Sequence, residues 1–256
     1  MEGRPVGPAN YEWALRRPGR APFIMLTEFP RSGGNWIRDM LGDALQLPVL
    51  RFSRLPATFP SIVHNHDYRV LGGHRSVYVL RDGRDVLSHM DKTITTFLDA
   101  SPPLQASILR LHPLLSVLKA GGVQYRIDPI AFYGEWRRRS LGSRVSWGEH
   151  VGPWRQARPV NTTFVRYEDM QRAPEETLAE SAVKLRGGPV SDTTITFAVA
   201  RNSFEAQTGR KPGEKDVKST KRMGLSGVWK TQMSDQLQKI FLRAFGKTLS
   251  AAGYET

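Results

Sequence analysis

The sequence contains no cysteine among its 256 residues. This absence excludes disulfide bonds, cysteine-ligated zinc and iron–sulfur sites, and any reaction that needs a thiol nucleophile, and it fits a reducing compartment. Long apolar runs are also missing, because the first twenty residues carry charges and prolines and the most hydrophobic later stretch, 108–118, is interrupted by Arg110, His112 and Pro113. We therefore expect a soluble cytoplasmic chain with no signal peptide and no membrane-spanning helix.

Acidic residues are outnumbered by basic ones, with 24 Asp and Glu against 37 Lys and Arg and a formal net charge of +13. A surplus of this size favours an anionic partner, but charge alone does not choose between nucleic acid, a membrane surface and a phosphorylated small molecule. The hydrophobic share of 39% is enough to bury a substantial core. The length suits one domain over residues 1–256 rather than two.

A strand, a polar turn and a helical stripe follow one another three times along the chain. The apolar runs 22–29, 76–80 and 162–167 each lead into such a turn and helix. This alternation predicts an α/β fold with a central, mostly parallel sheet flanked by helices. A final helix is expected between Ser234 and Gly253. Residues 93–160 suggest an insertion on the side of a second substrate, and the Gly- and Lys-rich residues 209–227 suggest a mobile loop.

The first of these turns, residues 30–36, is the strongest candidate for a binding site. A glycine-containing turn between a strand and a helix presents backbone N–H groups and the positive end of the helix dipole, which together bind phosphate. Arg31 adds a cation, and Trp36 is either a core residue or a stacking face. The turn is not a Walker A loop, because it lacks both the Gly-Lys-Ser/Thr ending and a hydroxyl for Mg²⁺.

Residues 30–36, Pro-Arg-Ser-Gly-Gly-Asn-Trp, resemble the 5′-phosphosulfate-binding loop of sulfotransferases that use 3′-phosphoadenosine 5′-phosphosulfate (PAPS). The family pattern is Pro-Lys-Ser-Gly-Thr-Thr-Trp, so Arg31 stands for lysine, and Gly34 and Asn35 stand for two threonines. Four further segments resemble motifs of this family and follow one another in the same order as in the family. They are the 3′-phosphate segment at 78–86, the Tyr-Glu-Asp element at 166–170, the Ser-Phe-Glu segment at 203–205 and the Arg-Lys-Gly-x-x-Gly-Asp-Trp-Lys signature at 222–230. The resemblance thus covers residues 23–230 outside 93–160.

The resemblance implies a P-loop-like fold, PAPS as the cofactor, adenosine 3′,5′-bisphosphate (PAP) as its product, and no metal. It assigns the cofactor contacts to Arg31, Ser32, Gly33, Gly34, Asn35, Trp36, Arg81, Ser88, Tyr167, Phe204, Arg222, Met223 and Gly224. The family's serine after the 3′-phosphate arginine falls on His89, with Ser88 one position early, and the choice between them stays open. The resemblance also implies that residues 209–227 form a lid over the cofactor.

A histidine that titrates near neutral pH suits the removal of a proton from an acceptor hydroxyl. By resemblance to the family's Lys-Thr-His element, His66 is the expected general base, and His64 takes the place of the lysine. In an extended segment, residues two apart share a face, so both histidines can reach one cleft. Arg31 is the second expected catalytic residue, because it would stabilise charge on the leaving phosphate.

The predicted activity is in-line transfer of a sulfuryl group from PAPS to a hydroxyl or amine of an unidentified small-molecule acceptor. Neither nucleic acid nor a membrane is expected as a partner, and the oligomeric state stays open. One alternative is an ATP-dependent small-molecule kinase, which the missing Lys-Ser/Thr pair disfavours. Another is a basic nucleic-acid-binding protein with a vestigial nucleotide site, supported by the basic surplus and the patch Trp136–Arg139.

Overall fold

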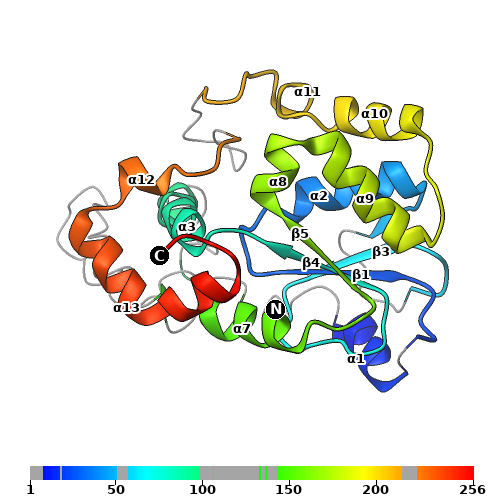
Figure 1. The fold of residues 1–256 in the computed structure, drawn as a ribbon, viewed down its shortest axis with the longest axis horizontal. Coiled ribbons are helices and arrows are strands. Elements are labelled where there is room, and N and C mark those ends of the chain that lie inside the picture. Colours follow the sequence, from blue (N-terminus) through cyan, green and yellow to red (C-terminus); the bar gives the residue numbers. More distant parts are fainter. Residues whose placement is uncertain are drawn as a thin grey trace.

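The computed structural model describes residues 8–17, 19–50, 57–98, 143–214 and 224–256, and the isolated residues 106, 133, 136 and 137. They form a single α/β domain around one sheet (Figure 1). No helix of this described part is long and apolar enough to cross a membrane.

The sheet has five strands in the order β2-β3-β1-β4-β5, and every neighbouring pair is parallel. The strands are β1 (Ile24–Glu28), β2 (Val49–Leu50), β3 (Ile62–Asn65), β4 (Ser76–Leu80) and β5 (Thr162–Arg166). The predicted parallel α/β sheet is thus confirmed. The two-residue β2 was not expected, because a strand this short has no measurable alternation.

Helices cover both faces of the sheet (Figure 1). Helices α2 (Gly34–Leu45), α9 (Pro174–Arg186) and α10 (Asp192–Arg201) contribute to the core on one face. Helices α1 (Pro8–Arg16), α3 (Gly83–Leu98), α7 (Trp147–Ala157) and α13 (Asp235–Ala251) contribute to the core on the other. The short helices are α8 (Tyr167–Arg172), α11 (Phe204–Thr208) and α12 (Trp229–Gln232).

Strand β4 shows why the central strands read as continuous apolar runs. Val77 and Val79 pack into the core beside α2 and α9, whereas Tyr78 and Leu80 pack into the opposite core. Successive side chains of a strand point to opposite faces, and here both faces are buried. Helix α13 has the expected cap, since Ser234 accepts a hydrogen bond from the Leu237 N–H.

The order of the strands places the site. The chain runs from β1 outward to β2 and β3, and then crosses to β4 on the other side of β1. In open parallel sheets, ligands bind beyond the carboxyl ends of the strands at such a reversal of strand order. The carboxyl ends of β1, β3 and β4 therefore define the candidate site.

Two expectations fall largely outside the described residues. Most of 99–142 is not described, but α7 lies in the described part of the expected insertion and buries Trp147 and Trp154 in the core. Within the expected lid, residues 215–223 are not described. Both the insertion and the lid stay predictions.

Candidate functional site

The loop between β1 and α2 has a backbone shape that demands glycine at one position. Arg31 and Gly33 both have left-handed backbone conformations, with φ of 76° and 95°. A Cβ atom at Gly33 would lie 2.4 Å from Cδ2 of Tyr167, and this contact, together with a φ that disfavours side chains, explains the glycine there. Helix α2 begins directly after this turn, and its N-terminus therefore faces the loop.

Arg81, the first residue after β4, connects three separate parts of the chain. Its guanidinium donates to the carbonyl oxygens of Arg31 (3.3 Å) and Leu225 (3.1 Å), and it lies 4.0 Å from the centre of the Tyr167 ring. The Nε atom of this buried side chain has no hydrogen-bond partner among the described residues. The structure thus brings the loop, the start of α8 and the segment after residue 223 together around one cation.

Two pairs of the expected aromatic and glycine residues are in contact. Trp36 meets Tyr167 edge to face at 5.5 Å, and its Nε1 donates to the Asn202 carbonyl oxygen. A Cβ at Gly224 would lie 2.6 Å from the Phe204 ring, and Gly224 has φ of 60°. Close approach of backbone to an aromatic ring explains both Gly33 and Gly224.

Asp85, which sequence reasoning did not assign to the site, holds the segment 224–230 in place. Its fully buried carboxylate accepts hydrogen bonds from the N–H groups of Gly227 (2.6 Å) and Trp229 (3.0 Å). Burial raises the pKa of Asp85 above its ordinary value, although nearby Arg81 and the two N–H groups lower it. A carboxylate in the first turn of a predicted helix was the available signal, but such residues are common at helix starts for other reasons.

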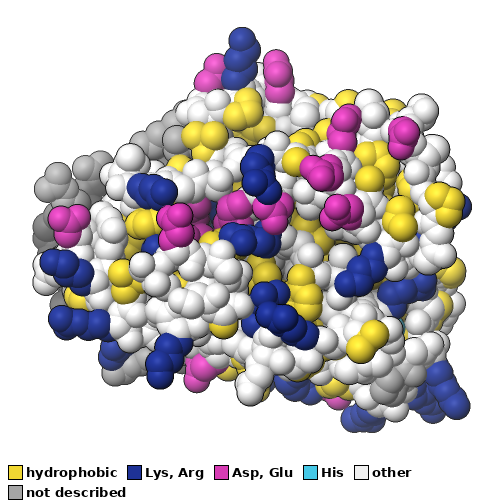
Figure 2. Space-filling model, in the orientation of Figure 1, with side chains coloured by type: hydrophobic (Ala, Val, Ile, Leu, Met, Phe, Trp, Pro, Cys, Tyr) yellow, Lys and Arg dark blue, Asp and Glu magenta, His cyan; other side chains and the backbone are white. Residues whose placement is uncertain are grey.

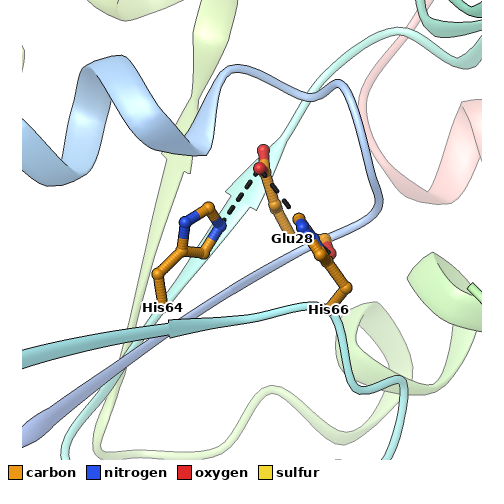
Figure 3. A group of neighbouring side chains, drawn as sticks. All are labelled: Glu28, His64 and His66. Carbon is orange, nitrogen blue, oxygen red and sulfur yellow. Dashed lines mark hydrogen bonds and ion pairs between the residues drawn. The ribbon is translucent and has the colours of Figure 1, made fainter. Parts of the chain in front are cut away.

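Three polar side chains gather where β1 and β3 end side by side (Figure 3). Glu28 is the last residue of β1, and its Oε1 lies 3.1 Å from His64 Nε2 and 4.0 Å from His66 Nδ1. Its Oε2 accepts a hydrogen bond from the Gly34 N–H at 2.5 Å. The two imidazole rings are 5.0 Å apart, which confirms that the histidines share one face. Glu28 was not expected in the site, although a charged residue ending an apolar strand was a usable signal.

The hydrogen bonds fix the protonation pattern of both rings. Arg38 can only donate, and its Nη1 lies 3.2 Å from His64 Nδ1. His64 therefore carries its proton on Nε2 and donates it to Glu28. His66 Nδ1 lies 3.2 Å from the Glu28 carbonyl oxygen, an acceptor, so neutral His66 keeps its lone pair on Nε2.

The electrostatics keep Glu28 charged and His66 neutral. Burial alone would raise the pKa of Glu28, but the hydrogen bond from His64, the electrostatic interaction with the two imidazole rings and the Gly34 N–H bring it below its ordinary value. The His66 side chain is 33% exposed, and its partial burial lowers the pKa of His66 toward about 4, with a further contribution from His64, while Glu28 opposes the shift. A neutral imidazole is ready to accept a proton at neutral pH.

Glu28, His64 and His66 also have the residue types of a metal site, and their candidate ligand atoms lie within 4.8 Å of one another. A metal on His64 Nε2 would displace the proton that this atom donates to Glu28. The proton would have to move to Nδ1, which faces the Arg38 donor. The observed hydrogen bonds therefore favour a proton-carrying relay over a metal centre.

The remaining expected residues differ in their placement. The Ser88 hydroxyl is buried and donates to the Arg84 carbonyl oxygen at 2.9 Å, within α3. The Ser32 N–H donates to the Phe29 carbonyl oxygen, and exposed Asn35 accepts from Arg38. Arg222 and Met223 lie outside the described residues.

Comparisons with known proteins give a family match and similar folds. The sulfotransferase domain family matches residues 73–253, which include Arg81, Tyr167 and Phe204 but begin after the loop and His66. A mouse sulfotransferase, SULT7A1, complexed with PAP has a similar fold, with a TM-score of 0.66, 16% identity, and coverage of 96% of this chain and 90% of that one.

A second similar structure is retinol dehydratase with androsterone and PAP, with a TM-score of 0.63, 16% identity, and coverage of 94% of this chain and 85% of that one. Comparison with curated protein sequences gave no significant match.

Proposed function

The chain belongs to the sulfotransferase family, its activity is sulfuryl transfer from PAPS, and we propose that His66 deprotonates a hydroxyl or amine of a small-molecule acceptor. The observation that carries the proposed cofactor site is the arrangement around Arg81. There the loop, Tyr167 and the segment at Leu225 are joined at the carboxyl ends of the parallel strands.

The residues present fit an adenosine nucleotide with two phosphate positions. Arg31 and the loop N–H groups that Glu28 does not occupy would hold the 5′ end, and Arg81 with its unpartnered buried Nε would attract the 3′-phosphate. Tyr167 and Phe204 would lie beside the base. Ser32, Gly33, Asn35, Trp36, Ser88, Arg222, Met223 and Gly224 complete the proposed contacts. PAPS supplies the sulfuryl group when bound.

The acid–base part of the reaction falls to His66. Its Nε2 lone pair takes the acceptor proton while the new bond from sulfur to the acceptor atom forms and the bond from sulfur to the leaving phosphate oxygen breaks. Arg31 would stabilise the negative charge that develops on that oxygen. The charge balances, since the acceptor proton resides on His66 and the bisphosphate leaves as an anion.

The two other classes considered from the sequence have less support. The family match selects sulfuryl transfer over phosphoryl transfer. On the face shown in Figure 2, acidic side chains lie among the Lys and Arg side chains, so this face offers no continuous basic patch in the described residues. We further propose a cytoplasmic location and a small-molecule acceptor, which cell fractionation and a screen of acceptors for label transfer would test.

The test compares PAP with adenosine 5′-phosphate by isothermal titration calorimetry. Removing the 3′-phosphate should weaken binding at least tenfold, about 1.4 kcal/mol. In Arg81→Ala this difference should largely disappear, whereas Arg243→Ala, which removes an exposed arginine of α13, should preserve it. Equal affinity of the wild-type protein for both ligands would refute the proposed 3′-phosphate contact.

A further inference from the structure

Glu28 lies where the side chain of residue 34 would otherwise be. A Cβ atom built on Gly34 would come within 2.4 Å of the Glu28 carboxyl carbon. Gly34 does not have a positive φ, so the backbone itself would accept another residue there. The carboxylate in its observed position, rather than the backbone conformation, therefore leaves no room for a side chain at the first position of α2.

The surroundings of Glu28 require two acceptors. One carboxylate oxygen accepts from the Gly34 N–H, and the other accepts from His64 Nε2. A glutamine offers one acceptor and one donor group, so either orientation of its amide would place a donor against a donor. Because the Glu28 side chain is 4% exposed, water cannot easily relieve that conflict.

We propose that Glu28 is a positioning residue for sulfuryl transfer, whose carboxylate holds His64 in its Nε2–H form and ties the start of α2 to the strand end that carries His66. This inference rests on the proposed function. The chain of hydrogen bonds runs from Arg38 through His64 to Glu28, and the Gly34 N–H of the loop donates to the same carboxylate.

The carboxylate also has a task once His66 has taken up the acceptor proton. His66 then carries a positive charge, and Glu28 Oε1 lies 4.0 Å from its Nδ1. An opposite charge at this distance favours the charged ring. Glu28 would thus support the base during the reaction without touching the substrate.

The kinetic test is Glu28→Gln, with Glu180→Gln on the exposed side of α9 as a matched control that removes the same charge. We expect kcat to fall 10- to 100-fold in Glu28→Gln while PAP affinity changes less than threefold, and no change in the control. The pH below which kcat decreases should be lower in Glu28→Gln, because loss of the carboxylate lowers the pKa of His66. The variant replaces none of the other groups that face this pair, which are Arg31, Arg38, His64, His150 and Tyr78.

A second readout is independent of turnover. Nitrogen-15 NMR of labelled histidines distinguishes the two neutral tautomers, and His64→Gln assigns the His64 signals. The wild-type protein should show His64 protonated on Nε2 and His66 on Nδ1, and Glu28→Gln should lose the Nε2–H form of His64. If that variant does not fold, Gly34→Ala displaces the same carboxylate and should give the same change.

The outcomes separate the two proposals. A wild-type protein that neither binds PAP nor transfers label overturns the proposed function. An active wild-type protein whose Glu28→Gln variant keeps both its kcat and its His64 tautomer overturns the role of Glu28 alone.

Discussion

His66 combines a free lone pair with a low affinity for protons. Its Nδ1–H is held by a backbone carbonyl, and the pKa of the ring is lowered to about 4. His66→Ala should reduce kcat by about 10²–10⁴-fold, the usual contribution of a positioned base, and leave PAP affinity unchanged. Steady-state kinetics and calorimetry measure the two effects. A larger loss of kcat in His64→Ala than in His66→Ala would show that the roles of the two histidines are exchanged.

The pH dependence of the rate follows from the same side chain. Protonation of His66 removes the base. The value of kcat/KM for PAPS reports the free enzyme, so it should fall only as the pH approaches about 4. The bound phosphates are anionic and raise the pKa of His66, so kcat should begin to fall at a higher pH. Initial rates between pH 4.5 and 8 test this order. Coincident acid limbs near pH 6.5 would contradict it.

Among the secondary-structure elements, the start of α3 holds the segment 224–230, which includes the beginning of α12. Asp85 accepts two N–H groups of this segment, and the Arg84 guanidinium lies 3.8 Å from the centre of the Trp229 ring. Asp85→Asn keeps the shape but loses one acceptor, so we expect PAP affinity to fall about tenfold, ~1.4 kcal/mol. Calorimetry measures the loss, and an unchanged circular dichroism spectrum shows that the fold remains. Wild-type affinity in this variant would mean that the segment does not contribute to binding.

At the scale of the whole molecule, buried His150 links α7 to the sheet. It accepts a hydrogen bond from the Tyr78 hydroxyl (2.7 Å), and its Nε2 lies 3.3 Å from the His66 carbonyl oxygen. Burial lowers the pKa of His150 to about 4, so the unfolded chain binds the proton more tightly than the folded one. The stability should therefore be complete above about pH 6.5 and decrease as the pH falls toward 4.

Between pH 7.5 and 5, His150 alone should lower the free energy of unfolding by about 2 kcal/mol. Urea denaturation at both pH values measures this change. In His150→Gln the pH-dependent loss should be smaller by a similar amount. An identical pH dependence in the two proteins would show that His150 does not titrate in this range.

Local sequence signals were enough to predict the parallel α/β sheet, the loop between β1 and α2, and the cap of α13. These features depend on signals between near neighbours, such as apolar periodicity, a glycine in a turn and a serine before a helix. The shared face of His64 and His66 also follows from strand geometry alone. None of these inferences needs the order of the strands.

The contacts between residues far apart in the sequence became visible only in the folded chain. The contacts of Arg81 with Leu225, of Asp85 with Gly227 and of Glu28 with His64 join segments that lie far apart in the sequence. Such pairs depend on the strand order and on which side chains are buried together, and no local pattern encodes either. Glycine at position 34 is the clearest case, because it looks like a departure from a family pattern until the buried carboxylate of Glu28 fills the space.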